Sequence, residues 1–260
     1  MRLISTYKLL ILQLRVLLAL VSREVQTTFG KSTFGYIWAV IVPTASVGLL
    51  VFLFELGGRV APFGLSLALF FATGILTLEF FNNLSGKLMT VFDANRALLT
   101  YPIIKDVDTL LARSLLVIIT YLLIVFVFFG SLIALGLAAW PAAIEQVLAA
   151  FFATALLGMG VGATNAVIAS MWDTWIQIEK VLTRPLFFIS GIFYVPSHLP
   201  SEAITVLQWN PLLHLVEWFR EGYYPNYNSL VLDKSYAVFI GIGLLMVGLA
   251  SERFFRKRRF

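Results

Sequence analysis

The sequence contains no cysteine and only two histidines, His198 and His214. Without cysteine, the chain forms neither a disulfide framework nor a thiolate metal site. A bound metal needs three or four ligands, and the two histidines are too isolated to supply them. The sequence therefore predicts no metal site and no cofactor in this chain.

Charged residues are also scarce. They make up 13% of the 260 residues, whereas 60% are hydrophobic; a soluble domain carries about 25% charged residues. One core cannot hide this much apolar surface, so we predict a single all-α transmembrane domain over residues 1–260, with lipid as its solvent. A signal peptide is not expected, because Arg15, Arg23 and Glu24 interrupt the first apolar run and no small-residue cleavage site follows.

A nucleotide-binding loop is missing as well. The segment Gly30-Lys31-Ser32 resembles the end of a phosphate-binding loop, but Val25 occupies the position where that motif needs its first glycine. No convergent set of acids and histidines indicates a catalytic site. The net charge of +5 reports membrane topology rather than nucleic-acid binding in a chain this apolar.

Long apolar runs predict six transmembrane helices. Their expected ranges are 36–56, 63–84, 115–137, 142–171, 176–195 and 236–252. The fifth is the least regular, because Leu186 to Val195 covers only about 15 Å of helix before Pro196. This span therefore either starts earlier, near Trp175, or stops partway through the membrane. In the fourth span, small residues predict close helix packing; they are Gly158, Gly160 and Gly162.

The N-terminal segment 7–31 has an amphipathic pattern. Leucines recur at helical spacing, while Lys8, Arg15 and Arg23 lie elsewhere on the helical wheel. A basic amphipathic helix of this kind lies in the headgroup plane of a membrane. The alternative is a first transmembrane span, but the run from Leu9 to Val21 extends only about 20 Å, short of the ~30 Å hydrocarbon core.

Prolines interrupt the segment before the last span, yet many leucines remain there. We predict two short re-entrant helices over residues 199–222, the second from about Leu212 to Gly222. Asn210 suits the cap position and Pro211 the first helical position. Glu217 and Arg220 lie three residues apart, so we expect them to pair with each other or across a dimer. A loose external loop is the alternative.

The basic residues are distributed unevenly along the chain. With six spans and both termini inside, only three of the 19 Lys and Arg residues lie outside; they are Arg59, Arg220 and Lys234. The positive-inside bias therefore predicts cytoplasmic termini and a cytoplasmic loop from Lys87 to Arg113. This loop mixes charged and apolar residues at helical spacing, which is typical of a segment that contacts another protein.

Three groups of residues together resemble one protein family. The first is Arg23-Glu24 with Phe29-Gly30-Lys31-Ser32, Gly35-Tyr36-Ile37-Trp38 and Pro43; the second is Ser190-Gly191-Ile192-Phe193-Tyr194 with Pro196 and Pro200; the third is Asn210-Pro211-Leu212 with Glu217 and Arg220-Glu221-Gly222. In this order, and over almost the whole chain, they resemble the permease subunits of polysaccharide-exporting ABC transporters. The chain looks most like the capsular-polysaccharide branch.

The resemblance implies a multi-pass protein of the bacterial inner membrane that forms a homodimer and joins two copies of a separate ATP-binding subunit. ATP and Mg²⁺ would bind that partner, and the chain itself would add no catalytic site to the ATP-hydrolysing complex. The cargo would be a lipid-linked polysaccharide, with membrane lipid and periplasmic or outer-membrane export proteins as further partners. Permeases for O-antigen or teichoic acid are alternatives within the family. A secondary transporter would need paired ionisable residues near the midplane, and only Glu79 is a candidate.

The resemblance also implies that the region 94–106 contains the coupling helix, which fits into a cleft on the ATPase. The candidate coupling residues are Ala94, Asn95, Arg96, Leu98, Leu99, Tyr101 and Pro102. We expect the helical stretch to end at Tyr101, because proline disfavours helix at the preceding residue. Arg96 would reach carboxylates on the partner, and the apolar side chains would form a buried contact. An ordinary solvated turn is the alternative.

A second group of residues is expected to line the translocation path or its gate. Its members are Glu79, Tyr194, Trp209, Trp218, Glu217 and Arg220. An acid within a span is costly unless it faces water or a partner, so Glu79 either lines the path or makes a structural hydrogen bond to Asn82 or to another span. The aromatic residues could stack on sugar rings, but aromatic residues also favour membrane interfaces.

Overall fold

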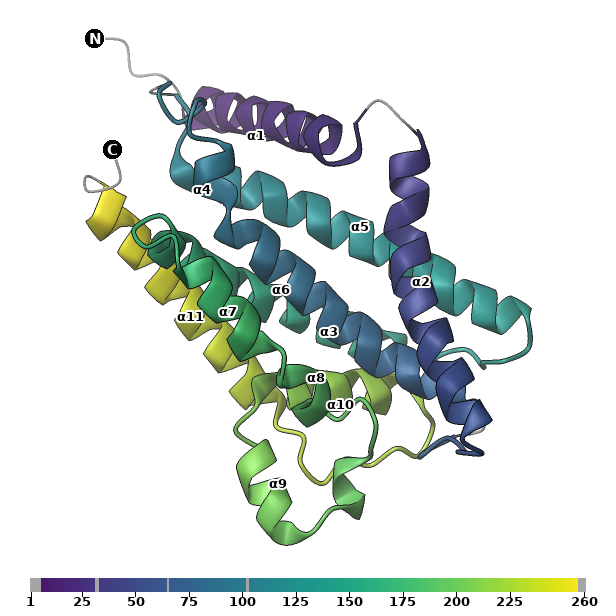
Figure 1. The fold of residues 1–260 in the computed structure, drawn as a ribbon. Helices are drawn as coiled ribbons and strands as arrows, with labels where there is room; N and C mark the ends of the chain where they lie inside the picture. The colour runs from purple at the N-terminus through teal and green to yellow at the C-terminus, as the bar shows by residue number, and fades with distance from the viewer. Residues whose placement is uncertain (1–5, 31–32, 65, 102, 257–260) are drawn as a thin grey trace.

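The structure is a computed structural model, and it describes residues 6–30, 33–64, 66–101 and 103–256. All of the regular elements in these ranges are helical (Figure 1). The longer helices are α1 (Thr6–Phe29), α2 (Thr33–Leu56), α3 (Leu67–Met89), α5 (Asp106–Ala134), α6 (Ile144–Ala169), α10 (Pro211–Tyr223) and α11 (Lys234–Phe255). The shorter ones are α4 (Val91–Ala94), α7 (Trp175–Thr183), α8 (Leu186–Ile189), the 3₁₀ helix η1 (Pro196–His198) and α9 (Ser201–Leu207). The predicted all-α class is confirmed for these residues.

Helix α6 forms the centre of the bundle and packs against both α3 and α11. Its small residues allow this, as the sequence predicted. A Cβ atom on Gly160 would lie 2.7 Å from the backbone oxygen of Gly241 in α11, and one on Gly162 would lie 2.7 Å from Leu88 Cβ in α3. The glycines therefore bring the helix backbones close together on two sides of α6.

Four of the helices are long and apolar enough to cross a membrane: α3, α5, α6 and α11, with 23, 29, 26 and 22 residues. They differ in how many residues of their most apolar stretch are buried within the protein, from 78% in α3 to 17% in α11. In α2, the apolar stretch covers Val40–Leu56. At 1.5 Å per residue it extends about 25 Å, which is close to the hydrocarbon thickness.

Helix α1 lies at a steep angle to α2 and packs along the first half of α5 (Figure 1). Among the side chains of α1 that the structure describes, Leu20 is buried, but Leu12, Leu14 and Leu18 are each more than half exposed. The helix thus has an apolar face that the described residues of this chain leave uncovered. The predicted range 7–31 forms one helix up to Phe29, and Lys31 lies outside the described residues.

The predicted start of α10 is confirmed. The side chain of Asn210 accepts a hydrogen bond from the Leu212 amide at 3.0 Å, and Pro211 is the first helical residue. Asn210 thus satisfies one of the amides that lack a partner at a helix start, and the missing N–H of Pro211 costs nothing there. The helix continues through Gly222 to Tyr223.

The segment 176–195, expected as one span, is not a continuous helix. Helix α7 ends at Thr183, α8 adds only four residues, and residues 190–195 are not helical. Pro185 cannot donate a backbone hydrogen bond to the preceding turn, and Gly191 has φ of +76°, in the left-handed region that favours glycine. The helical segment therefore begins at Trp175, as one of the two alternatives expected, but it breaks after Thr183 and its second part ends at Ile189.

The helical part of the loop between α3 and α5 also differs from the prediction. Helix α4 covers Val91–Ala94, and residues 95–101 form hydrogen-bonded turns instead of the expected helix from Ala94 to Tyr101. The side chain of Asn95 accounts for the difference, because it bonds to the backbone oxygen of Val91 at 2.9 Å and so competes with helix formation. Helix α3 continues to Met89 and α5 begins at Asp106, beyond the apolar ranges 63–84 and 115–137.

Candidate functional site

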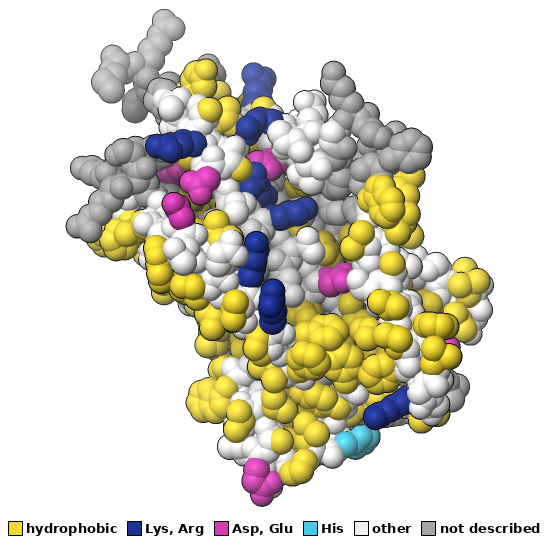
Figure 2. Space-filling view, viewed as in Figure 1, with side chains coloured by type: hydrophobic (Ala, Val, Ile, Leu, Met, Phe, Trp, Pro, Cys, Tyr) yellow, Lys and Arg dark blue, Asp and Glu magenta, His cyan; other side chains and the backbone are white. Residues whose placement is uncertain are grey.

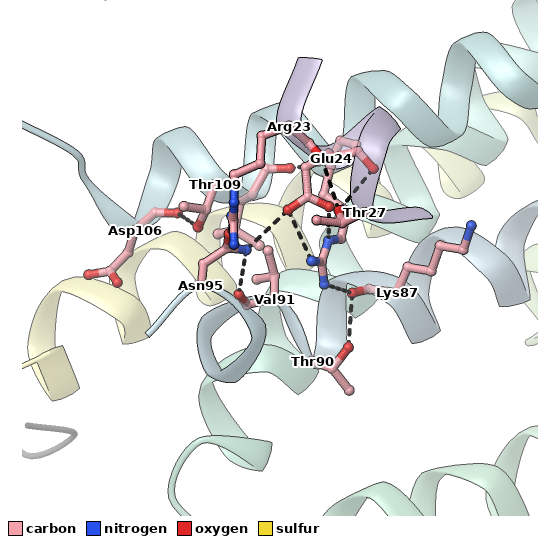
Figure 3. A network of polar contacts seen from close by, with 12 residues as sticks. Arg23, Glu24, Thr27, Lys87, Thr90, Val91, Asn95, Asp106 and Thr109 are labelled. Atoms are coloured by element: carbon pink, nitrogen blue, oxygen red, sulfur yellow. Dashed lines mark hydrogen bonds and ion pairs between the residues drawn. The ribbon is translucent and has the colours of Figure 1, made fainter. Parts of the chain in front are cut away.

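A polar network joins α1, α3 and α5 beside the loop that contains α4 (Figure 3). Glu24 of α1 forms a two-pronged ion pair with Arg113 of α5, with Arg113 Nε 2.9 Å from Oε2 and Nη2 3.0 Å from Oε1. Arg113 Nη1 also donates to the backbone oxygen of Lys87, in the last turn of α3, at 3.1 Å. The guanidinium group therefore holds three helices in register at this end of the molecule.

Asn95 ties the loop to this ion pair. Its amide donates to Glu24 Oε1 at 3.2 Å, and its side-chain oxygen accepts a hydrogen bond from Arg23. Asn95 is 1% exposed, and the Glu24 side chain is 4% exposed. Because the charge is buried, removing one partner of the Glu24–Arg113 pair should cost about 3–5 kcal/mol. Asn95, predicted as a coupling residue, lies inside the anchor of the loop.

The other predicted coupling residues lie around this anchor. Ala94, Arg96 and Tyr101 are exposed, whereas Leu98 and Leu99 are half-buried. Pro102 lies outside the described residues. The loop thus presents a cationic and an aromatic side chain outward, directly beside the residue that bonds to α1. Buried hydrogen bonds from Asn95 to Glu24, and from Glu24 to Arg113, connect this surface to α1 and α5.

Both terminal helices meet the start of α5 near the same loop. Gln13 of α1 donates a hydrogen bond to Asp108, and Arg256, just after α11, lies 3.0 Å from Asp106. Asp108 also accepts a hydrogen bond from the Lys105 amide at 3.0 Å. Carboxylates in the first turn of a helix are stabilised by the positive end of its dipole. The two carboxylates therefore both start α5 and fix its neighbours.

A second buried cluster is centred on Arg220 of α10, near the opposite end of the bundle. The guanidinium group donates to the backbone oxygens of Gly191 at 2.7 Å and of Ile192 at 3.3 Å, and to Thr73 Oγ1 of α3 at 3.2 Å. Its carbon lies 3.9 Å from the centre of the Phe70 ring. Arg220 is fully buried, and it satisfies the carbonyl groups that the non-helical segment 190–195 would otherwise leave without partners.

Glu217 is the counter-ion of Arg220. The two side chains lie 3.3 Å apart, which confirms the prediction that they pair with each other. Tyr227 and Ser229 donate further hydrogen bonds to the Glu217 carboxylate, at 2.8 and 2.7 Å. Burial, together with the Glu217 charge, raises the pKa of the Tyr227 hydroxyl, so this group remains a protonated donor. Both members of the buried pair thus have further hydrogen-bond partners.

The remaining candidates for the path or gate do not gather at one place. Tyr194 is half-buried, and its backbone oxygen accepts from Arg220 at 3.3 Å. Trp218 is buried and donates to Gln146 at 2.8 Å, whereas Trp209 is 71% exposed. Trp218 is therefore engaged in helix packing, and Trp209 is free to contact lipid or another molecule.

Glu79 lies apart from that cluster, on α3. It is half-buried, and Ser46 of α2 lies near its carboxyl group. Glu79 thus lies beside another helix, as the structural alternative requires, while the Ser46 hydroxyl donates to the Val42 backbone oxygen at 3.1 Å. The nearby Asn83 donates to the Tyr121 hydroxyl at 2.6 Å, so α3 makes a polar contact to α5 at this level.

Sequence reasoning missed Glu24 and Arg113 as a pair and Arg220 as a ligand of backbone carbonyls. Glu24 carried one signal, because it is an acid within an otherwise basic amphipathic helix. The described residues contain no group of three or more His, Asp or Glu side chains that could hold a metal ion.

Comparison with known proteins identifies relatives over most of the chain. Residues 15–224 match the family described as ABC-2 type transporter. A polysialic acid transport protein, KpsM, from Escherichia coli is 31% identical over 245 residues, covering 90% of this chain and 91% of its own. The capsule polysaccharide export inner-membrane proteins BexB of Haemophilus influenzae and CtrC of Neisseria meningitidis serogroup B are 27% and 28% identical, covering 95% and 97% of this chain and 94% and 96% of their own.

Proposed function

This chain belongs to the ABC-2 type transporter family, and on that basis we propose that it is the membrane-spanning subunit of an ATP-driven exporter of capsular polysaccharide. The observation that carries the proposal is the match to capsule-export relatives over at least nine-tenths of the chain. The cargo is a lipid-linked polysaccharide that crosses the bacterial inner membrane. ATP and Mg²⁺ bind to a separate ATPase subunit, two copies of which join a dimer of this chain.

The proposed topology has six spans with both termini in the cytoplasm. Five of the spans are the helices α2, α3, α5, α6 and α11. The remaining span, which lies between α6 and α11 in the sequence, is formed by α7 and α8 and is broken. Two observations support this arrangement: α1 and α11 both reach the start of α5, and Lys and Arg side chains gather over the end that holds α1 and α4 (Figure 2). Basic residues favour the cytoplasmic side. With its exposed leucines, α1 then lies in the headgroup layer.

The loop from α4 to α5 is the proposed contact with the ATPase. Arg96 and Tyr101 are exposed, while Asn95 links the same loop to Glu24 and through it to Arg113. ATP-driven closure of the partner subunits would push on the exposed side chains. The buried contacts would carry that push to α1, α3 and α5.

The segment from α8 to α10 is the proposed gate on the outer side. Helices α9 and α10 have only 7 and 13 residues, and a non-helical stretch precedes them. Irregular backbone is tolerated at membrane depth only where protein shields it. Arg220 supports a re-entrant placement, because it binds the carbonyl groups of this stretch inside the protein.

A deletion and complementation experiment tests the function. We expect deletion of this chain to abolish surface capsule and to leave polysaccharide inside the cell, and a plasmid copy to restore export. A copy expressed with a partner ATPase that cannot hydrolyse ATP serves as the matched control and should not restore it. Normal surface capsule in the deletion strain would remove the proposed function.

A further inference from the structure

A small polar cavity lies beside the Glu24–Arg113 pair. It is open on one side, is lined by residues of α1, α3 and α5, and has a volume of about 240 Å³. Sites for drug-sized ligands measure about 300–1,000 Å³, so this cavity fits a group of headgroup size. The polar residues that line it are Glu24, Thr27, Thr28, Lys87, Thr90 and Arg113.

The cavity has one cationic group that is not neutralised by a neighbour. Glu24 and Arg113 neutralise each other through two hydrogen bonds. Lys87, in contrast, takes part in none of the side-chain ion pairs found among the described residues, and its side chain extends away from Glu24 (Figure 3). The lining therefore carries a net positive charge, which belongs to the half-buried residue Lys87.

Hydroxyl groups lie around the same cavity. Thr27 donates to the backbone of its own helix at 3.1 Å, and Thr90 makes only a long contact of 3.4 Å to the Lys87 oxygen. The hydroxyl of Thr28 makes no hydrogen bond within the part of the chain that is described. Arg113 donates a hydrogen bond to the Lys87 carbonyl oxygen at 3.1 Å. This bond partly neutralises the negative end of the α3 dipole, which would otherwise repel an anion in the cavity.

We propose that this cavity binds a phosphate group of a lipid headgroup, with Lys87 as its cation and Thr28 as a hydrogen-bond donor. The inference rests on the proposed function, in which the end of α3 lies at the cytoplasmic membrane surface, where lipid phosphates are found. Two lipids carry this chemistry: the anchor of the exported glycan and a resident phospholipid. A headgroup held here touches the same Arg113 and Glu24 that connect the ATPase loop to the helices.

Binding is measured on the complex of this chain with its ATPase, in nanodiscs of phosphatidylcholine with increasing amounts of phosphatidylglycerol. Native mass spectrometry counts the complexes that retain phosphatidylglycerol. We expect Lys87→Gln to weaken retention on the order of tenfold, since a hydrogen bond to a charged group is lost, and Thr28→Val to weaken it less. Lys180→Gln is the matched control, because Lys180 is exposed on α7 outside the cavity, and it should retain the lipid as the wild type does.

To identify the lipid that supplies the phosphate, the complex is purified from two strains, one with and one without the polysaccharide-synthesis enzymes, and its bound lipids are identified by mass spectrometry. A Lys87-dependent glycolipid from the first strain identifies the anchor, and a Lys87-dependent phospholipid from both identifies a resident lipid; each result supports the site. Wild-type retention in both Lys87→Gln and Thr28→Val overturns the proposal. A lower melting temperature with unchanged retention also overturns it, because Lys87 would then only stabilise the end of α3. Neither result depends on export, so the proposed function is tested separately by capsule secretion.

Discussion

Replacement of Arg220 by methionine should destabilise the protein strongly. The change keeps a long, flexible apolar side chain but removes the hydrogen bonds to Gly191, Ile192 and Thr73 and the ion pair with Glu217. Breaking one side of a buried ion pair costs about 3–5 kcal/mol. Tyr227 and Ser229 still donate to the Glu217 carboxylate, which limits the loss on that side, while the carbonyl groups of segment 190–195 lose their donor.

The expected loss converts into a measurable shift in melting temperature. For a chain of this size, about 1 kcal/mol corresponds to roughly 2–4 °C, so we expect a fall on the order of ten degrees. Tryptophan fluorescence of the detergent-purified protein reports unfolding, because Trp218 is buried two residues before Arg220. Arg59→Met, at an exposed position, is the matched control and should change stability by no more than about 0.5 kcal/mol.

Two further variants separate the charge from the geometry. Arg220→Lys keeps the charge but lacks the planar fork, so it should fall between the wild type and Arg220→Met. Glu217→Gln in the Arg220→Met background removes the unpaired buried charge, and the double variant should be more stable than Arg220→Met alone. A melting temperature for Arg220→Met within a degree or so of the control, or simple additivity in the double variant, would refute the reasoning.

Four other predictions concern topology and transport. A cysteine at Arg96 should react with an impermeant thiol reagent only after the cells are opened, and reaction in intact cells would contradict the proposed orientation. Tyr101→Asp should insert normally but lose export and ATPase stimulation, because a charge placed in a buried protein contact is costly; Asp93→Asn on the same loop is its control. Glu79→Gln should keep the fold and alter export if Glu79 lines a hydrated path, whereas wild-type export from both Glu79→Gln and Glu79→Leu would leave Glu79 with a structural role only. Cysteines introduced across the outer segment should label rapidly at exposed Ser201 and slowly at buried Val216, and uniform rapid labelling would exclude the gate.

The sequence by itself determined the class of the protein and its local structure. Composition indicated a helical membrane protein, and apolar periodicity located the long helices, because both signals are carried by neighbouring residues. The cap and first residue of α10 were predicted for the same reason: Asn210 and Pro211 act within one turn of the backbone. The pairing of Glu217 with Arg220 also depends only on helical spacing.

Only the tertiary structure decided which distant residues meet. Glu24 and Arg113 are 89 positions apart, and Arg220 reaches the Gly191 carbonyl 29 positions away; nothing in the local pattern specifies either partner. The turn at Asn95 illustrates the same limit. Its residues favoured a helix from Ala94 to Tyr101 on sequence grounds, but the Asn95 side chain bonds to Glu24 of α1 and to the Val91 backbone. Local preference differs little between a helix and a turn in such a short segment, so a few buried hydrogen bonds to another helix are sufficient to decide between them.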